Sequence, residues 1–235
     1  FVSTEKKRSY PEGIKEFQKP GTGIWSIEHA VAPSIEALKE AKLNTILQTD
    51  DPEVLHIKDP VVYDTETGDT VLAFCTHPFN WSSSNSGFAV RPAGASDFSQ
   101  PNFTFFRRGF TWDVAMSRVT SVMRIPSVGA FAGEPISLFF YDGGECMRNL
   151  DEHTHAAKRP RGYSCEELGG LAYIQKDDLS SVERISRILP AFVSPHGTGS
   201  SRYVDVLATE DAFFVTWQQS QKDKSQPLVG HVVPK

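Results

Sequence analysis

Three segments of the chain share one pattern of apolar and polar positions. In each, an apolar strand is followed by a tight polar turn and by a second apolar strand rich in aromatic residues. The segments run from 59 to 74 around Gly68, from 122 to 141 around Gly133, and from 202 to 217 around Glu210. Alternation of this kind over short runs bounded by turn residues predicts antiparallel β-hairpins, so the chain is expected to be β-rich from about residue 54 onward.

The spacing of the hairpins indicates the architecture. Their turn centres lie about 65 and about 77 residues apart, which is too long for a solenoid repeat and suits large propeller blades with long loops. We therefore predict an all-β protein, a β-propeller of four-stranded antiparallel blades. The expected strands are 59–63, 70–76, 87–90 and 103–107 in one blade, 120–125, 136–141, 170–175 and 183–188 in the next, and 202–208, 212–218 and 228–233 in the last.

The first 56 residues are expected to be less regular. The stretch to about residue 21 is polar and is expected to be an arm or an incomplete element. Residues 23–27 are expected to form a strand, and residues 34–41 a short surface helix with Ser34 as its N-cap. Three blades do not close a ring. Either this region supplies a degenerate blade, or an N-terminal portion of the natural protein is absent, or the sheets form a sandwich. We expect a single propeller-like domain over 1–235, with three blades in 57–235.

Composition and charge exclude some partners. Hydrophobic residues make up 39% of the chain and aromatic residues 11%, enough for a sizeable core. The net charge is −5, which disfavours a protein that follows nucleic-acid phosphates. No apolar run approaches the roughly 18 residues needed to span a bilayer, so no membrane segment is expected. The oligomeric state is left open.

Three cysteines leave the compartment open. Cys75 falls in an apolar run and is expected to pack as a small buried side chain. Cys146 and Cys165 flank a polar loop, where they either form a disulfide or remain free thiols. A disulfide would indicate a secreted or periplasmic protein, and free thiols a cytoplasmic one.

A family resemblance covers about residues 57–233. It is carried by the run IKDPVVYD at 57–64 with Gly68 after it, and by GTGSS at 197–201 before the last hairpin. These segments resemble the blades of five-bladed propeller glycosidases of the arabinanase, xylosidase and fructosidase superfamily. The resemblance implies a five-bladed propeller, incomplete at the N-terminus, and hydrolysis of a carbohydrate in a central cleft. In that family the Asp that matches Asp59 orients the general acid and tunes it.

Two positions depart from the family pattern. Where the family carries Glu-Gly-Pro, with Glu as the general acid, this chain reads Arg124-Ile125-Pro126, and Ser200 stands where the last blade often carries His. Arginine cannot protonate a leaving group, so another acid would be required. Asp59 is the first catalytic candidate, and its alternative role is to cap the turn before Pro60. The candidates for its partner, each of which could instead be an ordinary surface carboxylate, are Asp113, Glu145 and Glu167.

Basic and aromatic residues suggest how a ligand would be held. Arginine forks bind carboxylates and sulfates, so arginines that converge would suit an acidic saccharide. Otherwise they stack on aromatic rings or pair with nearby acids. Tryptophans either stack on a sugar or pack between blades. The substrate-binding candidates are Arg118, Arg124, His196, Arg202, Trp81 and Trp112.

Metal and cofactor chemistry has little support. His153-Thr154-His155 lies in a polar loop near acids and cysteines but lacks the spacing of a zinc site. No phosphate-binding or nucleophile motif occurs, so neither a metal nor a cofactor is expected. The sequence thus favours a glycoside hydrolase. The alternative is a non-catalytic propeller that binds a saccharide or a protein partner.

Overall fold

The computed structural model describes residues 1–235 apart from 134, 145–147, 150–162, 165–166, 198 and 224. The described chain is all-β and forms antiparallel sheets of three or four strands, plus a two-stranded ribbon of β10 (Arg148–Asn149) and β11 (Tyr163–Ser164). It divides into two compact units, Phe1–Thr104 and Phe105–Lys235. The all-β prediction is therefore confirmed.

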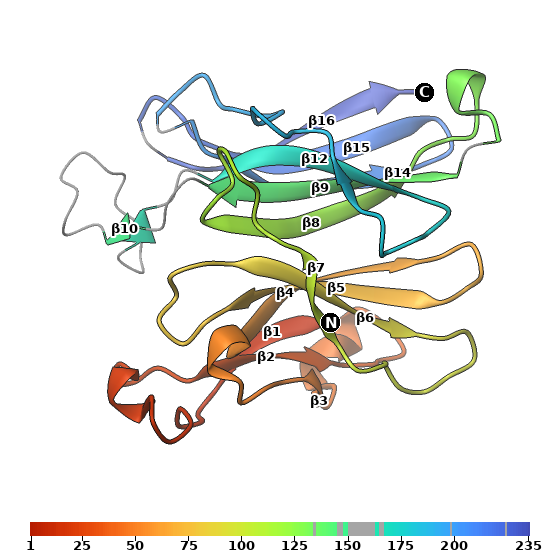
Figure 1. Cartoon of the computed structure of the whole chain (residues 1–235). Helices are drawn as coiled ribbons and strands as arrows, with labels where there is room; N and C mark the ends of the chain where they lie inside the picture. Colours follow the sequence, from red (N-terminus) through yellow and green to blue (C-terminus); the bar gives the residue numbers. More distant parts are fainter. Residues whose placement is uncertain (134, 145–147, 150–162, 165–166, 198, 224) are drawn as a thin grey trace. The chain divides into compact units, whose positions relative to one another are not determined.

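The first unit contains two sheets whose strands follow chain order (Figure 1). One has three strands: β1 (Val2–Lys6), β2 (Ile24–His29) and β3 (Asn44–Leu47). The other has four strands: β4 (His56–Asp64), β5 (Thr70–His77), β6 (Asn85–Arg91) and β7 (Asn102–Phe106). Each neighbouring pair is antiparallel, which allows tight hairpins such as the one at Gly68, whose φ is +83°.

The core of the first unit joins its two sheets. Ile27 and Leu47 from one sheet pack with Ile57, Leu72 and Phe74 from the other. Every residue of β5 is buried, and its stretch 71–75 is a continuous apolar run where a half-buried strand would alternate. Gly87 on β6 lets Phe74 pack closely, because a Cβ there would lie 2.6 Å from the ring.

The second unit also contains two sheets. The first has the order β13-β12-β9-β8 and the second the order β14-β15-β16. Its buried side chains include Trp112, Tyr141, Phe139 and Ile174, and burial of such large apolar surfaces is the main stabilising term. The strands are β8 (Met116–Arg124), β9 (Ile136–Gly144), β12 (Leu168–Gln175), β13 (Glu183–Arg184), β14 (Ser201–Ala208), β15 (Ala212–Gln219) and β16 (Leu228–Pro234).

Each of the eleven predicted strands from residue 59 onward has a counterpart in the structure, in the predicted order, and most are longer by a few residues. The strand predicted at 183–188 is shorter, since β13 covers only Glu183–Arg184, and the short strands β10 and β11 were not predicted. The N-terminal stretch, predicted to be an arm or an incomplete element, contains a strand, because residues 2–6 pair with β2. That strand reads VSTEK and lies at a sheet edge, where polar residues are tolerated and the apolar alternation is weak.

The described helices are short 3-10 turns: η1 (Lys15–Phe17), η2 (Glu36–Glu40), η3 (Pro52–Val54) and η4 (Gly129–Phe131). The predicted helix at 34–41 becomes η2. Ser34 Oγ accepts from Ala37 N at 3.4 Å, as expected of a capping residue. The apolar side of this helix is not covered, since Ile35 and Leu38 are exposed, and a short helix without packing gains little stability.

The first strand of three sheets carries a β-bulge. Pairing shifts between Lys58 and Val61 in β4, between Val119 and Ser121 in β8, and between Arg202 and Asp205 in β14. A bulge leaves residues unpaired, bends the strand and redirects side chains.

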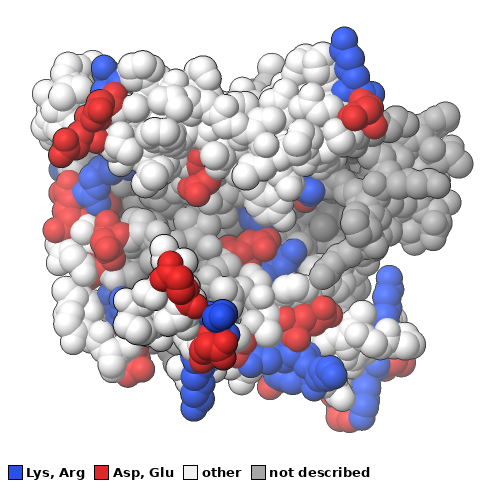
Figure 2. Space-filling model, turned by 180° about the vertical axis from the view of Figure 1, so that it is seen from behind, with Lys and Arg blue, Asp and Glu red and all other residues white. Residues whose placement is uncertain are grey.

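Acidic and basic residues are mixed on the face shown in Figure 2, consistent with the small net charge. Among the described residues, no helix has the length and hydropathy needed to cross a membrane.

Candidate functional site

Asp59 occupies the bulge of β4 in a conformation that few residues adopt. Its φ is +54°, the left-handed region that favours glycine. Its backbone N–H donates to Ser3 Oγ of β1 at 2.8 Å, so the neighbouring sheet satisfies the group that the bulge removes from the ladder. A non-glycine residue in this region costs on the order of 1–3 kcal/mol, and such strain is concentrated at functional sites.

The Asp59 carboxylate lies among polar partners and remains accessible. Its Oδ2 is 3.6 Å from Lys58 Nζ and accepts from Cys75 Sγ at 3.4 Å, while 26% of the side chain is exposed. Cys75 faces Lys58 in the strand register and is fully buried, as predicted for this cysteine. A partly exposed carboxylate beside a cation can orient a ligand or accept a proton from it.

Two tryptophans flank the same lysine. Lys58 Nζ lies 5.9 Å from the ring centre of Trp25 and 5.6 Å from that of Trp81, which is cation–π geometry. Trp81 is half-buried and has a φ of +59°. Together Lys58, Asp59, Cys75, Trp25 and Trp81 are called the Asp59 site below. It combines a carboxylate, a cation and aromatic surface.

His56 is buried beside the Asp59 site and contacts both of its tryptophans. Its ring stacks on Trp81 with centroids 4.3 Å apart. Its Nδ1 accepts from Trp25 N at 3.4 Å, and its Nε2 lies 2.9 Å from Tyr10 Oη. Burial, and then the charge of Lys58, lower the pKa of His56 to about 4. The ring is therefore neutral near pH 7, with Nε2 carrying the proton that it donates to Tyr10.

A second polar group lies in the other unit and consists of two arginines and two carboxylates. Arg118 Nη2 is 2.7 Å from Asp142 Oδ2 and 3.4 Å from Glu167 Oε1. Arg202 Nη1 pairs with Glu167 Oε2. These four residues, called the arginine–carboxylate cluster, are buried or nearly so, and their formal charges balance. Arg118 and Arg202 thus converge, on Glu167.

Asp142 is the most deeply buried member of the cluster. Both of its carboxylate oxygens accept from Tyr203 N, at 3.0 and 3.1 Å. Burial raises the pKa of Asp142 to about 6; Arg118 opposes this rise and Glu167 adds to it. The side chain is fully buried, so it acts on a ligand only through the residues it holds.

Tyr203 is the exposed aromatic residue next to the cluster. It occupies the bulge of β14 with a φ of +54°, and 37% of it is exposed. The guanidinium carbons of Arg118 and Arg202 lie 4.2 and 5.2 Å from its ring centre. Arg202 Nε also donates to Gln218 Oε1 at 2.9 Å. The cluster therefore fixes an aromatic ring at the surface.

Two candidates from the sequence lie in the interior of the second unit. Asp113 Oδ2 accepts from Arg184 Nε at 2.9 Å and from Tyr141 Oη at 3.1 Å, and its side chain is 1% exposed. Trp112 is 4% exposed and its Nε1 donates to Ser186 O at 2.9 Å. Burial and these partners favour a packing role for both residues.

Two basic candidates lie apart from the cluster. Arg124 stands at the opposite end of β8 from Arg118, about 20 Å along a strand that rises 3.4 Å per residue. There it is 3.3 Å from Asp177 Oδ2. His196 is half-buried, and its backbone N–H donates to Ser194 Oγ at 3.2 Å. Neither residue joins Arg118 and Arg202 in the described contacts.

Some sequence candidates lie outside the described residues. These are Glu145, both cysteines of the predicted pair, Cys146 and Cys165, and the segment 153–155. Within the part of the chain that is described, no three His, Cys, Asp or Glu side chains gather as metal ligands would.

Sequence reasoning missed Lys58, Asp142 and Tyr203. A signal for Tyr203 was present, because aligning the run Lys58-Asp59 with Arg202-Tyr203 places Asp59 and Tyr203 at one position of two hairpins. Asp142 offered no comparable signal, since its role depends on a contact between β9 and β14.

Comparison with known proteins gives matches in structure only. No family model and no curated protein matches the sequence significantly. The fold is similar to an alpha-L-arabinofuranosidase from Lactobacillus brevis, with a TM-score of 0.59 and 12% identity, over 99% of this chain and 66% of that one. A thermostable family-43 glycoside hydrolase has a TM-score of 0.57 and 11% identity, over 90% of this chain and 64% of that one.

A third similar structure is an alpha-L-arabinanase from Cellvibrio cellulosa complexed with arabinohexaose, with a TM-score of 0.51 and 8% identity, over 89% of this chain and 65% of that one. The chain therefore spans about two thirds of the length of each of these three proteins. At such identities the likeness concerns the fold. This chain has the all-β fold of glycosidases of the arabinanase and arabinofuranosidase type.

Proposed function

We propose that this chain acts on a carbohydrate as a glycoside hydrolase, with Asp59 in its site. The observation that carries the proposal is the strained conformation of Asp59, with a φ of +54°, which the fold maintains by the hydrogen bond that Asp59 N donates to Ser3 Oγ. Strain of this kind persists where the surrounding structure enforces it, and it often accompanies function. The proposal includes the five-bladed propeller that the family resemblance implies.

Asp59 is proposed to orient the reacting groups or to serve as a base. Its carboxylate is partly exposed and is held by Lys58 and Cys75, so its direction is fixed before a ligand binds. The flanking rings of Trp25 and Trp81 provide apolar surface for the C–H face of a sugar. Aromatic surface beside a few polar groups is typical of small-ligand sites.

Glu167, an acid candidate from the sequence, lies within the second unit, in the arginine–carboxylate cluster. Two guanidinium groups contact its carboxylate, those of Arg118 and Arg202. Because Arg118 and Arg202 are already compensated by carboxylates, the cluster favours a neutral saccharide over the acidic one expected from the arginines alone.

A second candidate function is saccharide binding without catalysis. One observation favours it: the pKa of Asp142 is raised by burial, but its side chain is fully buried and cannot reach a glycosidic oxygen. The replacement of the family's acid by Arg124 points the same way. In this alternative the Asp59 site and Tyr203 would be recognition surfaces.

A screen for reducing-sugar release separates the two functions. The full chain would be incubated with neutral and acidic oligosaccharides beside Asp59→Asn, with saccharide binding measured in parallel. Release that falls at least a hundredfold in the variant while binding persists supports the hydrolase, since a general acid or base contributes about 10²–10⁴-fold. Binding without release by the folded parent supports the alternative.

A further inference from the structure

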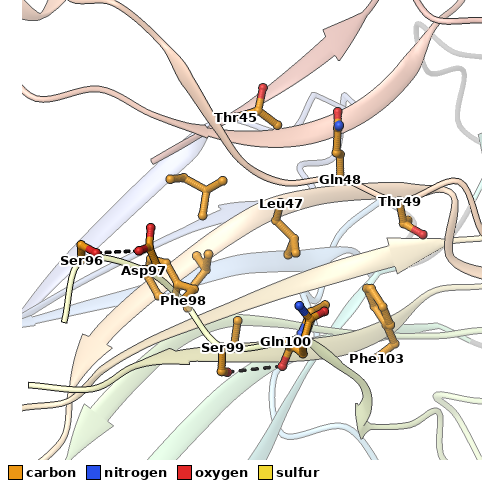
Figure 3. Close-up of a pocket in the computed structure, with 14 residues that line it drawn as sticks. Thr45, Leu47, Gln48, Thr49, Ser96, Asp97, Phe98, Ser99, Gln100 and Phe103 are labelled. Atoms are coloured by element: carbon orange, nitrogen blue, oxygen red, sulfur yellow. Dashed lines mark hydrogen bonds between the residues drawn. The ribbon is translucent and has the colours of Figure 1, made fainter.

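A pocket of about 560 Å³ lies in the first unit between two segments (Figure 3). One wall is the stretch 45–49, at the end of β3, and the other is the loop 96–101 between β6 and β7. None of the five residues of the Asp59 site lines it. Its size is within the range of small-ligand sites, about 300–1,000 Å³.

The floor of the pocket is apolar. Leu47, Leu72 and Ala89 belong to the buried core cluster, and Phe98 and Phe103 pack against that cluster. Two side chains hold Phe98 in place. The Arg91 guanidinium carbon lies 5.4 Å from its ring centre, and the Phe1 ring packs edge to face against it with ring centres 5.9 Å apart. A ligand here would contact a rigid hydrophobic surface.

The rim is polar and uncharged except at one position. Figure 3 shows Gln48 and Thr49 on one side and Ser99 and Gln100 on the other, all bearing amide or hydroxyl groups. None of the fourteen described lining residues is Lys, Arg or His. The single acid, Asp97, accepts from Ser96 Oγ at 2.6 Å. The described lining therefore has no positively charged side chain to balance the charge of an anionic ligand.

We propose that this pocket is a second carbohydrate-binding site that takes a neutral sugar ring. A sugar ring has an apolar C–H face, which suits the floor, and a hydroxyl edge, which suits side chains that both donate and accept hydrogen bonds. The choice of a sugar as the ligand rests on the proposed function. The site would bind a saccharide independently of Asp59 and without chemistry of its own.

Nuclear magnetic resonance on the full chain tests this proposal, with arabinohexaose as the probe. The Asp59→Asn variant would be used so that the probe stays intact. The side-chain amide signals of Gln48 and Gln100 should shift on titration. The pocket affinity should fall at least fivefold in Gln48→Ala/Gln100→Ala and stay unchanged in Gln175→Ala, which alters an exposed glutamine in the other unit.

Absence of amide shifts at millimolar arabinohexaose, or equal affinity in the pocket variant and its control, would overturn the proposal. Stronger binding of a sulfated than of a neutral sugar at these amides would also overturn it. The glutamines are exposed, so the variants are expected to fold. Hydrolysis without shifts at the pocket would refute this site alone, whereas shifts without hydrolysis in the parent would refute the proposed hydrolase alone.

Discussion

Asp59 and Tyr203 occupy the same position in the first strands of two sheets. Each directly follows the last residue paired before a bulge, Lys58 or Arg202, and each has a φ of +54°. Each donates its backbone N–H to a side chain of a neighbouring sheet, Ser3 Oγ for Asp59 and the Asp142 carboxylate for Tyr203. The fold therefore contains the same arrangement twice: a residue with positive φ at a bulge, held by a hydrogen bond to a neighbouring sheet.

Replacing Asp59 separates backbone strain from function. Asp59→Gly removes the left-handed penalty, so we expect it to be more stable than Asp59→Ala by about 1 kcal/mol. Both variants should lose hydrolysis, because the carboxylate is gone. Urea unfolding of the two proteins measures the difference. Equal stability of the two variants would show that residue 59 is not strained.

Tyr203 is expected to contribute to saccharide affinity through its ring. Tyr203→Ala should weaken binding in the second unit by about 1 kcal/mol, roughly fivefold, whereas Tyr203→Phe should retain most of it. Titration calorimetry with neutral oligosaccharides provides the measurement. An alanine variant that binds as well as the parent would assign the ring to packing against Arg118 and Arg202.

The arginine–carboxylate cluster should make stability depend on pH. Arg118→Met leaves the buried Asp142 carboxylate without its guanidinium partner, which costs about 3–5 kcal/mol near pH 8. The cost should be smaller near pH 5, where Asp142 takes up a proton. Burial raises the pKa of Asp142 to about 6, so its contribution to stability is full below about 3.8 and is lost as the pH rises through about 6.

Arg124→Met is the matched control for this variant. Arg124 is paired with Asp177 but 37% of its side chain is exposed, so its loss should cost less than about 1 kcal/mol at either pH. Chemical unfolding of both variants at pH 5 and pH 8 compares them. A penalty for Arg118→Met that does not change with pH would contradict the assignment of Asp142 as the titrating group.

His56 should produce the opposite dependence on pH. Because burial lowers its pKa to about 4, its contribution to stability is present above about 6.5 and is lost as the pH falls toward 4. The loss amounts to about 3 kcal/mol at most, from 1.36 kcal/mol per pKa unit. His56→Gln should remove this acid-dependent loss, as measured by melting temperature between pH 7 and pH 4. An equal fall in melting temperature in the variant and the parent between pH 7 and pH 4 would contradict the prediction.

The sequence predicted the strands from residue 59 onward because they combine apolar alternation with clear turn residues such as Gly68. It did not predict β1, whose polar residues lie at a sheet edge, and it predicted a longer helix at 34–41 than η2 provides. Both departures have one cause. The pattern of apolar and polar positions indicates burial only where another element covers the segment.

The site was harder to predict because its key contacts cross between strands. Asp59 was proposed from a local motif. Arg118 and Arg202 were expected either to converge on a ligand or to stack on aromatic rings and pair with nearby acids, and in the structure they contact the Tyr203 ring and Glu167. Their shared partner Glu167 was identified as an acid, but the pairing itself brings together residues distant in sequence. The burial of Asp113 could not be foreseen, because it depends on Arg184 and Tyr141.

The most direct test of the account is the catalytic rate of the full chain and of Asp59→Asn on one neutral oligosaccharide that the parent cleaves. Asp211→Asn, which alters an exposed aspartate, serves as the control. The account predicts that kcat falls at least a hundredfold in Asp59→Asn, with saccharide affinity and folding retained, and is unchanged in the control. Full activity in Asp59→Asn, or no cleavage of any oligosaccharide by the folded parent, would contradict it.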